Sequence, residues 1–275
     1  NAGSVSLEAG LKHAIALKDL SLSAPATTVA SLPTSLTSLS LLDCNLSALP
    51  AGLSALHQLG SLELAGNTLR AASFAALSSL MQLTLLSFAN CGVAAMPMQL
   101  SGLTGLEYLY LDDNPGVPVE QLEVLSGLTC LKALGLSGCR LRALPAALSA
   151  LGELRMLFCH GNRLTSLAES SWLSRLEVLS LSLIDLCCCQ DQLKYYAEKL
   201  ITLYISRSGD PAEQRCAGLL DVLASLPSLA TVFYTRSEPS PGRQMLESFE
   251  FEQVLHRLQT QTECEVDYIE SDEID

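Results

Sequence analysis

The chain has 275 residues, of which 49% are hydrophobic, so it can bury one large core or two ordinary ones, and a disordered protein is excluded. Its 16 Lys and Arg residues against 29 Asp and Glu residues give a net charge of −13, which disfavours nucleic acids and anionic lipids as partners. No segment reaches the roughly 20 consecutive apolar residues of a membrane-spanning helix, and residues 1–10 lack a signal-peptide layout. The composition predicts a soluble protein with a basic or neutral protein partner.

One leucine-rich pattern, L-x-x-L-x-L-x-x-N/C-x-L, repeats along most of the chain. Its successive copies are 23, 24, 23, 25, 23 and 22 residues apart. Each copy contains a short strand with one apolar side, and one copy alone cannot bury that side. We therefore expect about nine stacked copies that pair their strands into a parallel sheet over a shared core. The regular copies begin at Leu36, Leu59, Leu83, Leu106, Leu131, Leu154 and Leu176.

The ninth residue of each copy alternates between cysteine and asparagine. At the bend after a strand, this residue can pair backbone groups that would otherwise be buried without partners. A Leu-Pro type of turn follows only in the cysteine copies, at Leu49-Pro50, Met96-Pro97 and Leu144-Pro145. The alternation indicates a duplicated unit of two repeats. The predicted ladder consists of Cys44, Asn67, Cys91, Asn114, Cys139 and Asn162.

Residues 36–56 (LTSLSLLDCNLSALPAGLSAL) and 131–151 (LKALGLSGCRLRALPAALSAL) carry the full pattern. In these residues the chain resembles the leucine-rich-repeat family, in its intracellular class with an L-P-x-x-L-x-x-L ending. The resemblance covers roughly residues 17–234. It implies an α/β fold, a right-handed solenoid with a concave parallel sheet and a convex side of irregular segments and short helices. It also implies that a partner protein docks on the concave sheet.

The regular pattern changes after residue 176. There the ladder position falls on Ile184, and the run Cys187-Cys188-Cys189 follows. Two more strand signatures, at residues 200–205 and 229–234, predict longer repeats with a helix between them, over residues 211–226.

The end of the chain has a different composition again. A second helix is expected over residues 244–258, where it would cap the last edge of the core, and seven acids lie in the last 13 residues. The predicted organisation is an irregular N-terminal repeat over 1–35, regular repeats over 36–190, longer repeats over 191–237, a capping helix in 238–262 and a solvated acidic tail over 263–275.

The outward-facing strand residues are the candidate partner-binding residues. Side chains alternate along a strand, so the third, fifth and seventh residues of each copy point outward together. Aromatic residues gather at the fifth position although only 5% of the chain is aromatic, and Tyr and Phe are frequent interface anchors. Their preference for strands is the alternative explanation. The predicted partner-binding residues are Tyr108, Tyr110, Asp112, Asp113, Gly135, Met156, Phe158, His160, Tyr204, Arg207, Phe233 and Arg236.

A trough and a charge gradient are expected on this face. With strands about 4.8 Å apart, Tyr110 and Phe158 would lie roughly 10 Å from each other across Gly135. Aromatic faces and the acids Asp112 and Asp113 favour a Lys or Arg of a partner with a basic segment, while Arg207 and Arg236 would meet its acidic end. The alternative is that acids are common throughout this chain and the gradient is due to chance.

The sequence contains no catalytic or metal-binding constellation. Cys189-Gln190-Asp191 has no neighbouring histidine that could act as a base, and adjacent cysteines lack the C-x-x-C spacing of zinc sites. We expect a non-enzymatic adaptor or scaffold without a cofactor or a metal. The alternatives are a structural subunit of a large assembly and, more remotely, the substrate receptor of an enzyme complex.

The ten cysteines fall mostly at repeat positions, where a small thiol is a structural choice. We therefore expect reduced thiols and an intracellular, cytoplasmic protein; a targeting segment ahead of Asn1 stays open. The run Cys187-Cys188-Cys189 is expected to be a buried or lipidated thiol cluster. The triplet Asn45-Leu46-Ser47 resembles a glycosylation site, but such triplets occur often by chance.

Overall fold

The computed structural model describes residues 16–23, 32–167, 170–206, 218–235, 255–260, 262 and 264–268. The chain divides into two compact units, which are described separately. Unit 1 comprises Asn1–Cys139 and Pro145–Glu153, and unit 2 comprises Arg140–Leu144 and Leu154–Asp275.

Unit 1 has one short strand in each repeat, and every strand pairs in parallel with that of the next repeat. The register is constant, because the central leucines Leu39, Leu62 and Leu86 lie opposite one another and are fully buried. Their neighbours in the strands therefore point to the other face of the sheet. The strands are β1 (Asp19–Leu22), β2 (Ser38–Leu41), β3 (Ser61–Glu63), β4 (Leu85–Ser87), β5 (Tyr108–Tyr110) and β6 (Ala133–Gly135).

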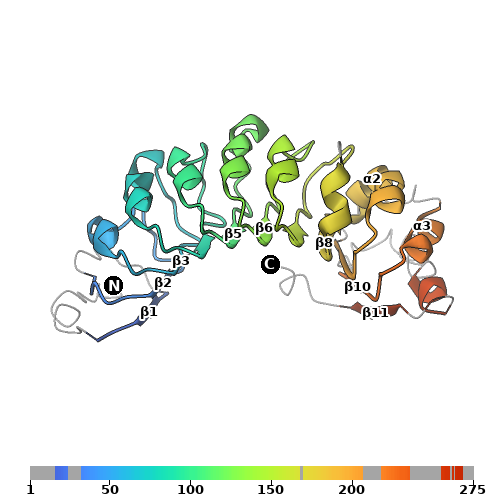
Figure 1. Cartoon of the computed structure of the whole chain (residues 1–275), viewed down its shortest axis with the longest axis horizontal. Coiled ribbons are helices and arrows are strands. Elements are labelled where there is room, and N and C mark those ends of the chain that lie inside the picture. The colour runs from blue at the N-terminus through green and yellow to red at the C-terminus, as the bar shows by residue number, and fades with distance from the viewer. Residues whose placement is uncertain are drawn as a thin grey trace, which may run out of the picture. The chain divides into compact units, whose positions relative to one another are not determined.

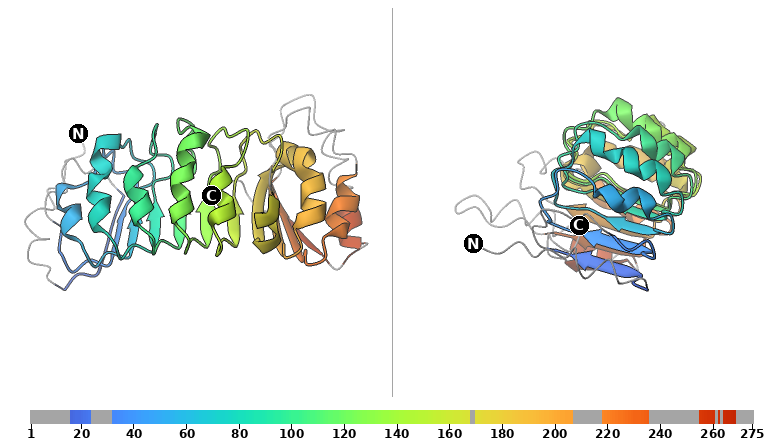
Figure 2. Two further views of the ribbon diagram at one scale, coloured as in Figure 1. Left: turned by 45° about the horizontal axis from the view of Figure 1, so that its top comes forward. Right: turned by 90° about the vertical axis from the view of Figure 1, so that its left-hand side faces the viewer.

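Short 3-10 helices return the chain on the side of unit 1 opposite the strands (Figures 1 and 2). Each contributes a fully buried leucine, such as Leu53, Leu77 and Leu100, to the same interior as the strand leucines. The core is thus built of columns of leucines, each buried only because the next repeat covers it. The helices are η1 (Ala51–Ala55), η2 (Ala71–Ser79), η3 (Met98–Gly102), η4 (Val119–Gly127) and η5 (Ala146–Ala150).

The alternation between cysteine and asparagine repeats extends to the backbone. In the cysteine repeats, the residues on both sides of the cysteine have a left-handed conformation, as Asn90 (φ 48°) and Gly92 (φ 63°) do around Cys91. In the asparagine repeats, only the residue before the asparagine does, as Gly66 (φ 72°) before Asn67. The 3-10 helices differ accordingly. They have 5 residues in the cysteine repeats (η1, η3, η5) and 9 residues in the asparagine repeats (η2, η4).

Unit 2 continues the same plan with longer elements. Its strands are again parallel and in register, with Leu157, Leu179, Leu203 and Val232 fully buried beneath them. The helices α2 and α3 take the place of the short 3-10 helices (Figure 1). The elements are β7 (Met156–Phe158), η6 (Ser170–Arg175), β8 (Val178–Ser182), α2 (Leu183–Tyr196), β9 (Thr202–Ser206), α3 (Leu219–Ser225), β10 (Thr231–Tyr234) and β11 (Glu265–Tyr268).

The predicted α/β repeat fold with a parallel sheet is confirmed in both units. Two elements differ from the sequence expectation. Helix α2 begins at Leu183, inside the segment expected to hold regular repeats, and β11 lies in the segment 263–275 that was expected to be a solvated tail. None of the helices in the described part of the chain is long and apolar enough to cross a membrane.

Candidate functional site

The candidate site lies on the outer face of the sheet, the face opposite the leucine core. In unit 1 it is centred on β5, where Tyr108 and Tyr110 flank the fully buried Leu109 and are themselves half-buried. The turn after β5 adds Asp112 and Asp113, of which Asp113 is exposed. We call these four residues, the two tyrosines and the two aspartates, the tyrosine–aspartate surface.

Asp112 lies over the neighbouring strand instead of pointing into solvent. Its Oδ1 accepts a hydrogen bond from the Ser137 backbone N–H (2.7 Å), and a Cβ atom at Gly135 would overlap its carboxylate. The space above Gly135 is therefore covered by this carboxyl. Burial raises the pKa of Asp112 to about 6, the Ser137 hydrogen bonds lower it, and the charge of Asp113 adds a further small increase.

The rest of the tyrosine–aspartate surface is polar and acidic. Burial, followed by the charge of Asp112 and by Tyr108, raises the pKa of Tyr110, so its hydroxyl is protonated at neutral pH and can donate a hydrogen bond. Asp113 has a left-handed backbone (φ 54°), and its carboxylate occupies the place that a Cβ at Gly138 would need. One exposed carboxylate and one phenol are thus available to a cationic or hydrogen-bonding group.

In unit 2 the outer face of the sheet carries an aromatic row, which consists of Phe158, Tyr204 and Phe233. The Tyr204 and Phe233 rings are stacked, with centroids 4.9 Å apart, and the Phe158 and Tyr204 rings are tilted, with centroids 6.5 Å apart. Phe158 and Tyr204 approach each other although β8 lies between their strands, because the intervening residue is Ser180, which is fully buried. The row presents a continuous apolar surface of the kind that anchors protein interfaces.

The other predicted residues of unit 2 lie beside this row or outside the described residues. The ring Nδ1 of His160 lies 2.7 Å from the Ser180 Oγ atom, and Met156 is half-buried in the same strand as Phe158. Arg207 and Arg236 lie outside the described residues. The predicted trough combines Tyr110 of unit 1 with Phe158 of unit 2, and it stays a prediction.

The asparagine ladder pairs buried backbone groups between successive repeats. Asn114, which is 1% exposed, accepts a hydrogen bond from Val93 N–H (2.9 Å) and donates to the carbonyls of Phe88 and Leu111 (2.9 Å each). Asn67 does the same one duplicated unit earlier, with Leu46 N–H (2.8 Å) as its donor. Each amide thus satisfies three backbone groups that have no access to water.

The cysteines occupy the same ladder position, but their side chains donate a hydrogen bond and are at most weak acceptors. The Cys91 thiol donates to the Leu64 carbonyl (3.0 Å), as an asparagine amide would, but sulfur does not accept the neighbouring N–H. The Cys91 backbone carbonyl accepts it instead, from Leu69 N–H (3.0 Å). At Cys91 this change of acceptor occurs together with a left-handed residue directly after the cysteine, Gly92, a conformation that the asparagine repeats lack at that place.

Asp185 is a ladder residue that the sequence analysis missed. The ladder position was expected at Ile184, but in the structure Asp185 Oδ1 accepts the Leu164 N–H (2.8 Å), the hydrogen bond that asparagine makes elsewhere. Asp185 is 1% exposed. A signal was present, because the preceding ladder step, from Cys139 to Asn162, is 23 residues, and the same step from Asn162 leads to Asp185.

The run Cys187-Cys188-Cys189 has one buried thiol, Cys189, and one exposed thiol, Cys188. Burial raises the pKa of the Cys189 thiol to about 12, with smaller contributions from Asp185 and Cys188, so it is not a thiolate at neutral pH. No group of three His, Cys, Asp or Glu side chains that could hold a metal occurs among the described residues. Cys187 is disulfide-bonded, which differs from the reduced thiols expected from the sequence.

No protein-family model and no curated protein matches the chain. Among solved structures, internalin C2 of Listeria monocytogenes is similar with a TM-score of 0.46 and 20% identity, over 86% of this chain and 81% of that one. A plant peptide hormone receptor, RGFR1 in complex with RGF2, has a TM-score of 0.47 and 22% identity, but the match covers 78% of this chain and only 33% of the receptor. An internalin, inlF, of the same bacterium has a TM-score of 0.45 and 18% identity, over 86% and 81% of the two chains. At these values the similarity says nothing about function.

Proposed function

We propose that this chain, a protein of leucine-rich-repeat fold, is a non-enzymatic interaction module that binds a partner protein on the outer face of its sheet. The observation that carries the proposal is the aromatic row. Phe158, Tyr204 and Phe233 lie in contact on a surface where a monomeric protein of net charge −13 would more readily place polar side chains.

We propose that the negative charge of the tyrosine–aspartate surface determines which partner binds there. Tyr108, Tyr110 and Asp113 offer aromatic faces and a carboxylate, which together favour Lys or Arg over neutral side chains. Glu63 adds a second carboxylate two strands away, where it accepts a hydrogen bond from Ser40 Oγ (3.2 Å). A partner segment that carries basic residues fits this surface best.

A permanent subunit of a larger assembly is the second candidate, and one observation favours it. Large apolar side chains are also exposed away from the sheet face. Met98, at the start of η3, is 81% exposed, and Tyr195 in α2 is 72% exposed. In an assembly these side chains would be covered as well, so binding would involve the helical side of each unit in addition to its strand side.

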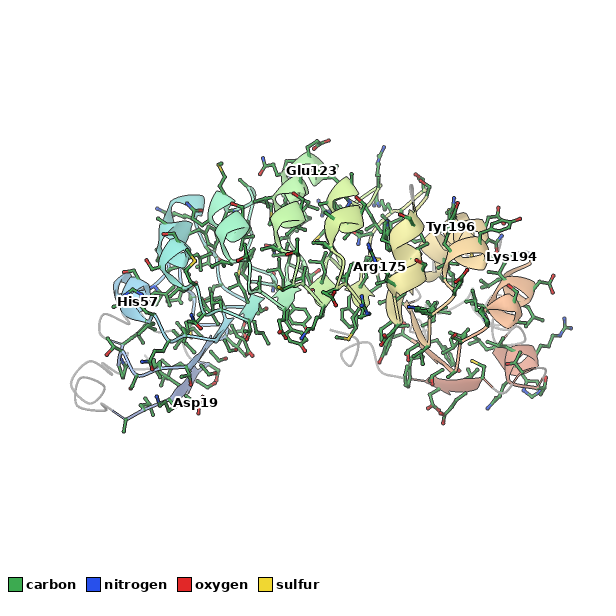
Figure 3. All side chains as sticks on the ribbon, viewed as in Figure 1. Asp19, His57, Glu123, Arg175, Lys194 and Tyr196 are labelled. Atoms are coloured by element: carbon green, nitrogen blue, oxygen red, sulfur yellow. The ribbon has the colours of Figure 1, made fainter. Side chains whose placement is uncertain are left out.

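Crosslinking mass spectrometry on native extract distinguishes the two candidates, because it reports both the partner and the face in contact. The interaction module predicts crosslinks at lysines near the strands, such as Lys132, and few at Lys194 on α2, which Figure 3 shows on the helical side of unit 2. Crosslinks of equal number at both lysines, with a constant stoichiometry of co-purified chains, would support the assembly subunit instead.

A further inference from the structure

Asp185 is an acid in a ladder that otherwise uses neutral side chains, which are Cys44, Asn67, Cys91, Asn114, Cys139 and Asn162. It lies in the first turn of α2, three residues after Ser182, which precedes the helix. In sequence this Ser-x-x-Asp pattern is typical of a helix-capping box. In the structure, however, Ser182 makes no side-chain capping bond, and the Asp185 carboxyl is turned inward to Leu164 N–H.

The second oxygen of this carboxyl, Asp185 Oδ2, and the Ser182 Oγ atom are both buried, and neither has a partner at full hydrogen-bond geometry among the described residues. A weak hydrogen bond from the Ser182 hydroxyl to the Asp185 carboxyl nevertheless lowers the pKa of the acid. At the corresponding place in the preceding repeat, the Asn162 amide nitrogen donates to the Cys159 carbonyl (2.8 Å). A carboxylate cannot donate such a bond, whereas a protonated carboxylic acid can.

We propose that Asp185 makes the packing of α2 within unit 2 dependent on pH, because only its neutral form has both a donor and an acceptor, as a ladder asparagine has. The ionised form leaves a charge in a site that is 1% exposed, and Asp185 makes no ion pair within the described part of the chain. Deprotonation therefore lowers the cost of opening α2 locally, and acidification raises it.

The surroundings of Asp185 agree with this assignment. Burial is the largest influence on its carboxyl and raises its pKa from 3.8 to about 6, while the Ser182 hydroxyl and the Leu164 N–H lower it. Strands β8 and β9, which pack against α2, contain no charged residue. The titratable and charged groups on α2 itself and on the other adjacent segments are His160 and Arg163 after β7, Arg175 on η6, Asp221 on α3, and Cys188, Cys189, Asp191, Lys194, Tyr195 and Tyr196 on α2.

The direction of the pH effect follows from the raised pKa. The folded state binds this proton more tightly than the unfolded state, so the stabilisation is complete below about pH 4 and is lost as the pH rises through about 6. At neutral pH the carboxyl is ionised and α2 is in its looser state. A shift to about pH 5 protonates the Asp185 carboxyl and raises the free energy needed to open α2 locally.

Native-state hydrogen exchange of the intact chain tests the proposal. We expect the protection factors of α2 amides, corrected for intrinsic exchange rates, to be about fivefold or more higher at about pH 5 than at about pH 7.5. In Asp185→Asn they should be the same at both pH values. In the matched control Asp112→Asn, which removes the other carboxyl of raised pKa among the described residues but lies in unit 1, the wild-type difference in α2 should remain.

Wild-type α2 protection that does not change with pH, or a change that persists in Asp185→Asn, would overturn the proposal. If Asp185→Asn fails to fold, an NMR titration of the carboxyl carbon of Asp185 in the wild type decides instead. A midpoint near pH 6 that coincides with the change in α2 protection supports the proposal. A midpoint at the ordinary value of an aspartate contradicts it.

Discussion

Replacing Asn114 by alanine removes four hydrogen bonds at once, and two of the backbone groups involved lose a partner that nothing replaces. Val93 N–H loses its acceptor and the Phe88 carbonyl loses its donor, both in the interior. The Leu111 carbonyl keeps a donor, because the Cys139 thiol also contacts it (3.4 Å). One orphaned buried N–H and one orphaned carbonyl cost about 2–4 kcal/mol of unfolding free energy.

The matched control is Cys139→Ala, one repeat further on. The Cys139 thiol donates over 3.4 Å to each of two carbonyls, those of Leu111 and Ser137, and these contacts are long and weak. With the small volume of one sulfur atom lost, the expected cost is about 1 kcal/mol.

Urea unfolding followed by circular dichroism measures both variants. Trp172, the single tryptophan, lies in unit 2 and is 3% exposed, so its fluorescence reports that unit separately. Asn114→Ala should lower the unfolding midpoint clearly more than Cys139→Ala. Equal shifts in the two variants would show that asparagine does not pair the backbone groups in the way described, and the reasoning about the ladder would fail.

Three further outcomes are expected. Gly135→Ala should lower the free energy of unfolding by about 1–3 kcal/mol, because the new Cβ must displace the Asp112 carboxyl. In thermal melting, the double variant with Asp112→Ala should regain part of the lost stability. Arg140→Gly should stabilise by about 0.5–1 kcal/mol, since Arg140 has φ 57° and glycine adopts this conformation without strain; an unchanged or lowered urea midpoint would contradict this. Finally, because the pKa of Asp112 is raised from 3.8 to about 6, its stabilisation is present below about pH 4 and is lost as the pH rises through 6. Asp112→Asn should therefore flatten the decline in unfolding free energy between pH 4 and 6 by about 1–3 kcal/mol, and an unaltered pH profile would refute the burial of this carboxyl.

The repeated part of the fold could be predicted from the sequence because each strand and each 3-10 helix recurs with the same leucines. Leu39, Leu62 and Leu86 occupy one column of the core, so an error in one copy would break the pattern of its neighbours. The start of α2 could not be predicted in this way. It shifts the ladder position by one residue, from Ile184 to Asp185, and only the hydrogen bond to Leu164 identifies the residue in use.

Strand β11 and the position of the Asp112 side chain could not be predicted from the sequence, for two different reasons. In the sequence Glu-Val-Asp-Tyr of β11, only Val266 and Tyr268 alternate as a strand would, and the surrounding acids outweigh so short a signal. Its pairing with β10 also joins residues far apart in the chain. The side-chain direction of Asp112 depends on the empty space over Gly135 in the next repeat, which no pattern within one repeat encodes.

The most direct test of the proposed function is to measure partner affinity for Tyr110→Ala and Phe158→Ala, one variant for each unit, once crosslinking has identified the partner. The control is Glu123→Ala, since Figure 3 shows Glu123 on the helical side of unit 1, away from the strands. If the outer face of the sheet is the binding surface, each aromatic variant should lose about 2 kcal/mol of binding free energy, or about 30-fold in Kd, while the control keeps wild-type affinity. Wild-type affinity in both aromatic variants, with the fold intact, would contradict binding on this face.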